Sequence, residues 1–365
     1  MSRFEPAADP RDAIARGFYV PRPGKGIGAE LASRFEVKPS ASHLLVGGIG
    51  SGKTTQLLVA RDALAANDDV LATYIDVSLT LDPANLSWFA LVALVGMALV
   101  KSVADEEKGQ AIPVPGVFNI ALDHDDRFED PEALEIDLTA ALGEVVSRAA
   151  RRYDQSRDVV VLIDSLDRMT DLARFGEIVT SALPVLRQAG LGVIIVGPLT
   201  SIYGLQGAIV DRFDRFHHLP VVNVQTDAKG LDFLLTVIRA RDPDNLIDTA
   251  TAFKLALFSG GVLRDLVALA QLAGEEAYVD GADRVELHHV KSAADIFGRR
   301  QMTALDSEQV TRLLLVRKNG TFVQMSEKDL ALLSTRRVLE YPSGSPRFAV
   351  HPTMEALLAQ VAHAG

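Results

Sequence analysis

Residues 43–60, HLLVGGIGSGKTTQLLVA, decide the fold of this chain. Within them, residues 47–54 form a complete G-x-x-x-x-G-K-T phosphate-binding loop. An apolar run precedes the loop and a segment that can open a helix follows it, which is the strand–loop–helix context that the motif requires. The glycines let main-chain N–H groups wrap an anion, and the helix N-terminus adds partial positive charge.

We assign nucleotide binding to a continuous run of residues: Gly47, Gly48, Ile49, Gly50, Ser51, Gly52, Lys53, Thr54 and Thr55. Lys53 is expected to reach the terminal phosphates and assist their transfer, and the Thr54 hydroxyl is placed to ligate Mg²⁺. The sequence therefore predicts ATP and Mg²⁺ as ligands. The alternative is an ordinary glycine-rich turn in front of a helix.

Composition bounds the class of protein. The chain has 365 residues, of which 48% are hydrophobic, and a mean hydropathy of +0.16, which predicts a sizeable core. A formal net charge of −11 argues against constitutive nucleic-acid binding through a broadly basic surface. Because there is no cysteine, disulfides and thiolate metal sites are excluded, which fits a reducing cytoplasm.

No apolar core of a secretory signal is visible in the first ten residues. Residues 86–100 are apolar on every face, but this run is shorter than the roughly 20 residues that span a bilayer. We expect a buried helix here, a cytoplasmic protein and no membrane partner.

Short β-branched runs alternate with helical segments in the first part of the chain. Strands are expected at residues 43–46, 70–75, 159–163, 192–196 and 216–222. Strands separated by helices predict a doubly wound parallel sheet, a three-layer αβα arrangement of the α/β class. Asp82-Pro83 and Asp130-Pro131 each indicate the start of a helix. Residues 107–130 are expected to form a surface loop, whose acidic cluster 123–126 is either solvated or a metal site.

The pattern becomes helical after residue 226. Helices are expected near residues 231–240, 246–258, 262–278 and 287–300, and Gly260-Gly261 should end the second. Two short helices, a hairpin with its turn at 342–346 and a last helix at 354–362 should follow. The predicted division is an N-terminal arm (1–40), an α/β core (41–225), a helical lid (226–302) and a small α+β domain (303–365).

Polar side chains that follow two predicted strands extend the site. Asp164 ends the strand 159–163, where open α/β sheets place their ligands, and is expected to hold the Mg²⁺ shell. Asp167 is a candidate catalytic acid that orients or deprotonates the attacking water. Its alternatives are an ion pair with Arg168 and a helix cap. Thr200 follows the strand 192–196, and its hydroxyl is a candidate for sensing the γ-phosphate or positioning the attacking water. The alternative is a polar strand-to-helix turn.

Three arginines are candidates for offsetting the negative charge of phosphoryl transfer. Arg212 and Arg215 stand just before the last predicted strand, and one of them is expected to act as an arginine finger. Arg264 opens a helix after Ser259-Gly260-Gly261 and is expected to sense the γ-phosphate. The alternative for each is a solvated surface charge.

Together these residues resemble an additional-strand P-loop ATPase of the AAA+ and STAND types. In that division, a strand with the acidic residue lies between the phosphate-loop strand and its sequence neighbour. Residues 259–269, SGGVLRDLVAL, are similar to the lid motif of replication-initiator ATPases, in which a comparable Arg contacts the γ-phosphate. Residues 211–215, DRFDR, resemble the arginine-finger segment of AAA+ proteins.

The resemblance covers about residues 40–300 and has departures. Residues 164–168, DSLDR, resemble the Asp-Asp-Leu-Asp-Arg motif of KAP-type ATPases, and STAND proteins, more closely than an AAA+ motif. Most AAA+ members carry Glu directly after the metal Asp, where this chain has Ser165, so the resemblance leaves the identity of the catalytic acid open. KAP members carry membrane helices between the two nucleotide motifs, and this chain has one short apolar run there.

Residues 305–365 resemble a winged-helix domain, a class that binds either DNA or protein. The candidate recognition helix, 326–334, carries only one basic residue. The basic side chains offered to DNA phosphates are Arg299, Arg300, Arg312, Arg317, Lys318, Arg336 and Arg337. Partner protein, homo-oligomer and DNA bound through 303–365 all stay open.

The leading hypothesis is an ATPase that acts as a switch, in which ATP and ADP make different lid contacts and so change oligomerisation or partner binding. One alternative is a DNA-binding regulator or defence component in which ATP is mainly structural. Another is a scaffold that binds ATP without turnover. The adjacent pairs His217-His218 and His288-His289 are expected to diverge, so neither should bind a metal.

Overall fold

The computed structural model describes residues 3–5, 9–24, 26–106, 112–123, 130–152, 155–203, 209–341 and 347–364. By their contacts, the residues of the chain form two compact units. The sheet unit comprises Ile27–Val46 and Lys53–His218. The C-terminal unit comprises Met1–Gly26, Gly47–Gly52 and Leu219–Gly365, so the six residues of the phosphate loop before Lys53 belong to it by packing.

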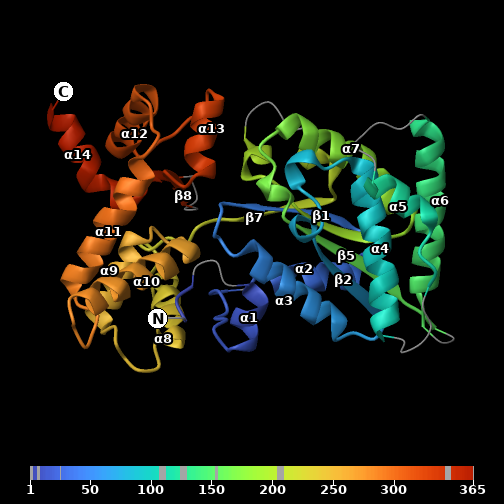
Figure 1. Ribbon diagram of the computed structural model, residues 1–365, viewed down its shortest axis with the longest axis horizontal. Coiled ribbons are helices and arrows are strands. Elements are labelled where there is room, and N and C mark those ends of the chain that lie inside the picture. The colour runs from blue at the N-terminus through green and yellow to red at the C-terminus, as the bar shows by residue number, and fades with distance from the viewer. Residues whose placement is uncertain are drawn as a thin grey trace. The chain divides into compact units, whose positions relative to one another are not determined.

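A five-stranded sheet with the order β2-β5-β6-β1-β7 forms the centre of the sheet unit (Figure 1). The strands are β1 (Ser42–Gly47), β2 (Val70–Asp76), β5 (Asp158–Asp164), β6 (Gly192–Val196) and β7 (Arg215–Leu219). The pairs β1·β6, β6·β5 and β5·β2 are parallel. Both faces of β5 and β6 are buried, which is why their sequences are continuous apolar runs. The predicted doubly wound α/β sheet is confirmed, and its last strand ends at Leu219 rather than at residue 222.

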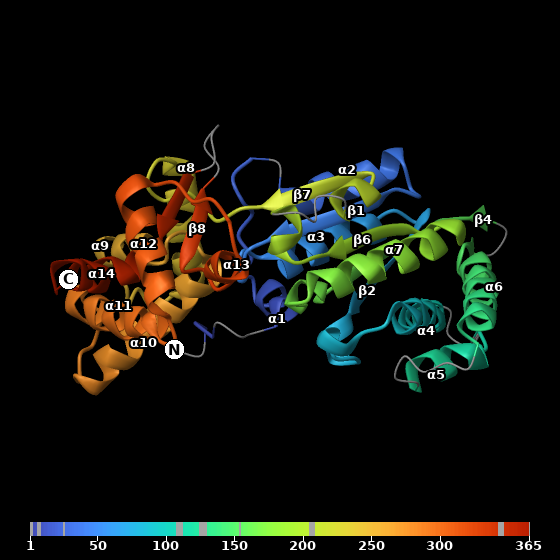
Figure 2. The ribbon, with the colours of Figure 1, turned by 90° about the horizontal axis from the view of Figure 1, so that it is seen from above.

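Helices cover both faces of this sheet (Figures 1 and 2). Helices α2 (Ile27–Val37) and α3 (Lys53–Ala65) pack together on one face. Helices α4 (Trp88–Glu106) and α7 (Leu172–Gln188) pack on the other, and α5 (Gly116–Asp123) and α6 (Pro131–Ala149) lie outside α4. Short 3₁₀ turns follow three strands: η1 (Val77–Leu79), η3 (Leu166–Arg168) and η4 (Leu199–Ile202). A two-stranded ribbon, β3 (Arg151–Arg152) with β4 (Gln155–Ser156), leads into β5.

Helix α4 holds the apolar run of the sequence. By length and composition alone, Trp88–Asp105 is long and apolar enough to cross a membrane, and 61% of this window is buried inside the protein. Its first turn differs from the prediction, because Asp82 caps the 3₁₀ turn η2 (Pro83–Asn85) and α4 begins only at Trp88.

The prediction of a loop over residues 107–130 is wrong in one part, since α5 lies within it. Phe118 of α5 is fully buried, and a Cβ added to Gly96 of α4 would lie 2.3 Å from its ring. The missing side chain of Gly96 therefore makes the space that holds α5 on α4. Of the acidic cluster 123–126, only Asp123 lies within the described residues. The predicted cap of α6 is confirmed, because Asp130 accepts a hydrogen bond from the Ala133 amide at 3.0 Å.

The C-terminal unit is helical with one hairpin (Figure 1). Its lid helices are α8 (Ala228–Arg241), α9 (Thr249–Phe258), α10 (Leu263–Val279) and α11 (Leu287–Met302). Its last elements are α12 (Ser307–Asn319), α13 (Glu327–Ser334), β8 (Val338–Tyr341), β9 (Arg347–Val350), η6 (Pro352–Met354) and α14 (Glu355–Ala364), and it also includes α1 (Pro10–Ala15). Strands β8 and β9 are antiparallel, as the predicted hairpin requires, and its turn at 342–346 lies outside the described residues.

Candidate nucleotide-binding site

The carboxyl end of β5 carries a buried carboxylate. Asp164 is 2% exposed and accepts hydrogen bonds from the Tyr74 hydroxyl at 2.9 Å and the Ser165 amide at 2.7 Å. Burial raises the pKa of Asp164, and a hydrogen bond with the Thr54 hydroxyl opposes this rise. The structure thus brings together the two residues that were predicted to hold Mg²⁺, because the parallel strands end at one edge of the sheet.

A second carboxylate lies beside the first. Asp76 is the register partner of Asp164 across β2 and β5. Ser165 has a left-handed backbone (φ +74°), and its hydroxyl donates to Asp76 Oδ1 at 2.7 Å. Ser165 is 4% exposed, and its hydroxyl links the ends of the two strands. Sequence reasoning missed Tyr74 and Asp76, although a polar residue at the end of a buried strand was the available signal.

Lys53 forms an ion pair within the same unit. Its Nζ lies 2.9 Å from Asp167 Oδ2, and the exposed fractions of the two side chains are 6% and 17%. Asp167 lies in the turn η3, which carries it from the end of β5 to the first residue of α3. Of the alternatives for Asp167, an ion pair is realised, but with Lys53 and not with Arg168. Asp167 therefore holds the ammonium group that a phosphate would need.

The glycine loop is held by groups of the C-terminal unit. Gly50 and Gly52 have φ values of +77° and +96°, which glycine adopts without strain. The Arg264 amide donates to the Gly50 carbonyl at 3.3 Å. The Ser51 hydroxyl is buried and has no hydrogen-bond partner among the described residues. A buried, unpaired hydroxyl in a loop of main-chain amides is suited to an anionic ligand.

Arg22 of the N-terminal arm contacts the phosphate loop, and sequence reasoning did not single it out. Its guanidinium donates to the carbonyl of Ser51 and, at 3.2 Å, to that of Pro220. Burial lowers the pKa of Arg22 to about 10. Arg22 lies between two prolines in the predicted N-terminal arm, and nothing in the sequence indicated its contact with the loop.

For Thr200, Arg212 and Arg215, the structure gives a position in the fold but, within the described part of the chain, no contact that tests their predicted roles. Thr200 lies half-buried in η4, directly after β6. Arg212 and Arg215 are both exposed, and Arg215 opens β7. An arginine finger that is supplied in trans comes from another chain, so these roles stay predictions.

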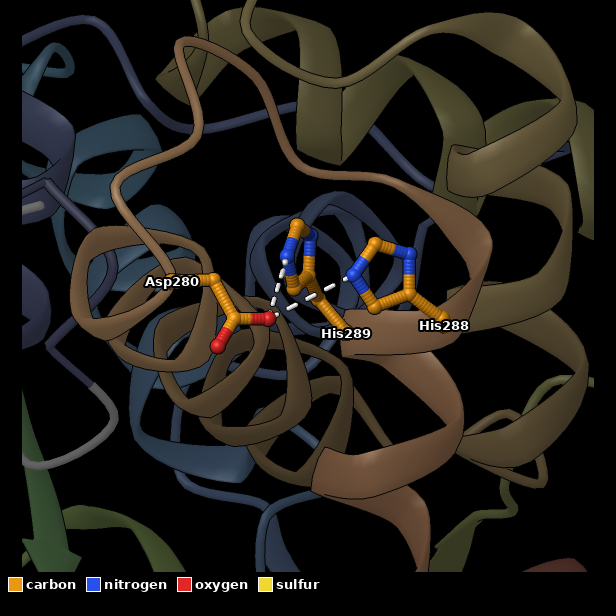
Figure 3. A group of neighbouring side chains, drawn as sticks. All are labelled: Asp280, His288 and His289. Atoms are coloured by element: carbon orange, nitrogen blue, oxygen red, sulfur yellow. Dashed lines mark ion pairs between the residues drawn. The ribbon is translucent and has the colours of Figure 1, made fainter.

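Asp280, His288 and His289 form a polar cluster at the end of α10 and the start of α11 (Figure 3). The prediction that the two histidines diverge is wrong, because their ring centroids are 3.8 Å apart. Their Nε2 atoms lie 3.4 Å and 3.2 Å from Asp280 Oδ2.

One contact argues against a metal at this cluster. Nδ1 of the buried His289 accepts a hydrogen bond from the Glu286 amide at 2.9 Å and caps α11. The neutral ring therefore carries its proton on Nε2, the atom that faces Asp280. A metal ligand needs a free lone pair at that atom, so His289 serves as a helix cap.

Comparison with known proteins places the fold. No protein-family model and no curated protein matches the sequence. Among solved structures, the Aeropyrum pernix ORC2 protein, determined with ADPNP and ADP, aligns over 96% of this chain and 98% of its own, with 15% identity and a TM-score of 0.50. The chain has the additional-strand P-loop ATPase fold. The strand order agrees with this fold, since β5, which ends at Asp164, lies between the phosphate-loop strand β1 and its sequence neighbour β2. A helical lid and a winged-helix-like domain follow the sheet.

Two further structures align over most of their length at lower similarity. Cdc6p from Pyrobaculum aerophilum covers 99% of this chain and 97% of its own at 11% identity and a TM-score of 0.48. The Thermotoga maritima RuvB Holliday junction branch migration motor covers 91% and 93% at 15% identity and a TM-score of 0.47. Similarity at these levels assigns no activity to this chain.

Proposed function

We propose that this protein binds ATP with Mg²⁺, hydrolyses it, and uses the difference between ATP and ADP as a switch. The buried Lys53–Asp167 ion pair carries the proposal, because it places a cation and a carboxylate where a phosphate-binding loop meets α3. A purely structural glycine turn does not require either charge. The ADPNP and ADP in the similar ORC2 structure support the nucleotide class.

The donor set at β5 fits Mg²⁺. This ion prefers oxygen ligands and keeps several waters, and the hydrogen-bonded Thr54 hydroxyl and Asp164 carboxylate are such ligands. When bound, Mg²⁺ neutralises charge on the phosphates. Asp76, bonded to Ser165, would support the position of Asp164 in the metal shell.

Asp167 has two successive tasks in this mechanism. It first neutralises Lys53, which stays buried and oriented without ligand. A triphosphate brings stronger charge to the same ammonium group, so Lys53 turns to the phosphates and the Asp167 carboxylate is released. The released carboxylate then accepts a proton of the attacking water as the water oxygen bonds to the γ-phosphorus, and the bond from that phosphorus to the β–γ bridging oxygen breaks, so that ADP and phosphate leave.

Three variants separate binding from turnover. Lys53→Ala should abolish detectable heat with Mg–ATP in calorimetry. Asp167→Asn should bind Mg–ATP but release phosphate at least about tenfold more slowly, since general-base groups contribute ~10²-fold or more. Arg168→Gln, an exposed neighbour in the same turn, is the matched control and should behave as the wild type. Equal phosphate release by Asp167→Asn and wild type would favour a scaffold without turnover by this acid.

Arg264 is the proposed sensor of the γ-phosphate. Its main chain already touches the loop through the Gly50 carbonyl, which supports a short reach from its side chain to a bound nucleotide. Arg264→Ala should reduce the preference for ATP over ADP while leaving ADP affinity nearly unchanged. Unchanged discrimination between the two nucleotides would remove this role.

The C-terminal domain is proposed to act on a protein or a second copy of the chain. Of the seven basic residues offered to DNA, five are engaged within the protein: Arg299 by Asp295, Arg312 by Asp329, Arg317 by Glu355, Arg336 by Asp265, and Arg337 by main-chain carbonyls. The basic residue of α13, Lys328, pairs with Asp306 and Glu308. These pairs weaken the phosphate attraction on which DNA affinity depends.

Filter binding with duplex DNA across a salt series tests this choice of partner. No retained DNA is expected at low salt, with or without ATP. A salt-dependent, ATP-gated signal would instead support the DNA-binding regulator. Sedimentation with ADP or a non-hydrolysable ATP analogue then tests whether a second copy is the partner.

A further inference from the structure

The first turn of α10 touches the phosphate loop on one side. The Arg264 amide donates to the Gly50 carbonyl, and a Cβ added to Gly50 would lie 2.5 Å from the Arg264 Cβ. Gly52 lies on the same turn at ordinary van der Waals distance, since its added Cβ would meet the Leu263 side chain at 3.4 Å. The loop and this helical turn are in direct contact through short, stiff groups, so a shift of the loop displaces the turn.

The next residue along α10 holds the winged-helix-like domain. Asp265 is 1% exposed, and its Oδ2 lies 2.9 Å from Arg336 Nε and 3.4 Å from His351 Nε2. Arg336 stands just before β8 with a left-handed backbone (φ +63°), and the fully buried His351 follows β9 directly. One carboxylate thus faces both strands of the hairpin at its open end, where β8 begins and β9 ends.

A hydrogen bond and an apolar contact also join β8 to the start of α10. The buried Tyr341 hydroxyl of β8 donates to the Gly260 carbonyl at 2.7 Å, in the turn that precedes α10. The Leu339 and Tyr341 side chains pack with Val262, the N-cap residue of α10. The hairpin is therefore fixed to the start of α10 by an ion pair, a hydrogen bond and an apolar contact.

We propose that Asp265 is a positioning residue that couples the nucleotide at the phosphate loop to the hairpin β8–β9. The coupling rests on the proposed function, because it needs a nucleotide that alters the loop. Arg264 contacts the phosphate loop, Asp265 contacts the hairpin, and the two are neighbours in one helical turn. A movement of Arg264 therefore displaces Asp265 without an intervening flexible linker. A ligand shifts the hairpin only by the difference in its affinity for the two positions of this turn.

Hydrogen exchange on the full chain tests the coupling. The readout is the exchange of amides in Val338–Tyr341, with and without a non-hydrolysable ATP analogue and Mg²⁺, alongside calorimetry of the same samples. In the wild type, the analogue should change this exchange by about tenfold or more, the size of a coupling near 1.4 kcal/mol. Asp265→Asn should still bind the analogue and should lose most of this change.

Two further variants provide an alternative to Asp265→Asn and a matched control. Arg336→Gln removes the opposite charge of the pair and should give the same loss if Asp265→Asn fails to fold. Asp295→Asn removes an exposed ion pair with Arg299 on α11 and should keep the wild-type response. Each variant is compared with its own nucleotide-free state, so altered hairpin stability alone does not imitate lost coupling.

The outcomes are distinct. No heat with any Mg–nucleotide in the folded wild type removes both the proposed function and the coupling. Heat with unchanged hairpin exchange in the wild type removes only the coupling. A wild-type response that survives in both Asp265→Asn and Arg336→Gln shows that the two ends communicate without this carboxylate, which also overturns the proposal.

Discussion

Lowering the pH from 7 to 5 should destabilise the sheet unit through a buried pair of histidines. His43 of β1 is 1% exposed, and its Nδ1 lies 3.0 Å from Nε2 of His217 in β7. Burial, with a smaller contribution from His217, lowers the pKa of His43 from 6.5 to about 4. Arg34 and Arg215 act in the same direction, and only Asp214 opposes them.

The sign of the effect follows from which state binds the proton. Between pH 6.5 and about 4, the unfolded chain protonates His43 while the folded protein does not, so stability falls as the pH falls through this window. For one such group, the free energy of unfolding should drop by about 2 kcal/mol between pH 7 and pH 5. Burial also lowers the pKa of His217, which adds in the same direction.

Urea unfolding measures this loss, and Trp88, the only tryptophan of the chain, reports on the sheet unit by fluorescence. His43→Phe keeps an aromatic ring of similar size and should remove most of the pH dependence. His288→Ala removes an exposed histidine of the C-terminal unit and should retain it. Equal pH dependence in His43→Phe and the wild type would refute the reasoning.

Three further outcomes follow from single contacts. His289→Ala removes a helix cap and should cost about 1–2 kcal/mol, whereas Zn²⁺ should leave the wild-type melting temperature unchanged; a zinc-dependent rise would contradict the tautomer. Asp329→Asn breaks a largely buried pair and should cost about 2 kcal/mol, far more than Lys328→Ala, when both are measured by chemical unfolding. Gly281→Ala should cost about 1–2 kcal/mol for its positive φ. Gly261→Ala should cost clearly more, since its Cβ would lie 1.7 Å from a carbonyl oxygen, and equal costs would refute the clash.

Much of the fold could be predicted because its signals are local. The runs that became β5 and β6 are β-branched and apolar on both faces, which leaves few alternatives to a central strand. The end of α9 was also predicted from glycines, since Gly260 and Gly261 have the positive φ values expected after the end of a helix. Asp164 was found by the same reasoning, because a carboxylate after a buried strand lies at the ligand edge of the sheet.

What the sequence left open depends on contacts between distant segments. Helix α5 forms where Phe118 finds the space beside Gly96, and the proline- and acid-rich residues around it favoured a loop. The Arg22 contact with the loop joins residues 29 positions apart, and the partner of Asp167 is more than a hundred residues away. Side-chain pairing also decides whether the basic residues of the C-terminal domain are available to DNA phosphates. Composition alone counts them all as free charge.

The division of the chain at Gly47–Gly52 has a consequence for dissection of the protein. The chain leaves one folded body for six residues and then returns to it, so no single cut separates a nucleotide-binding half from an output half. A fragment that ends near residue 225 would keep every residue of the consensus motif and lose the helical turn that holds Gly50. Its failure to bind ATP would therefore be no proof that the intact protein fails to do so.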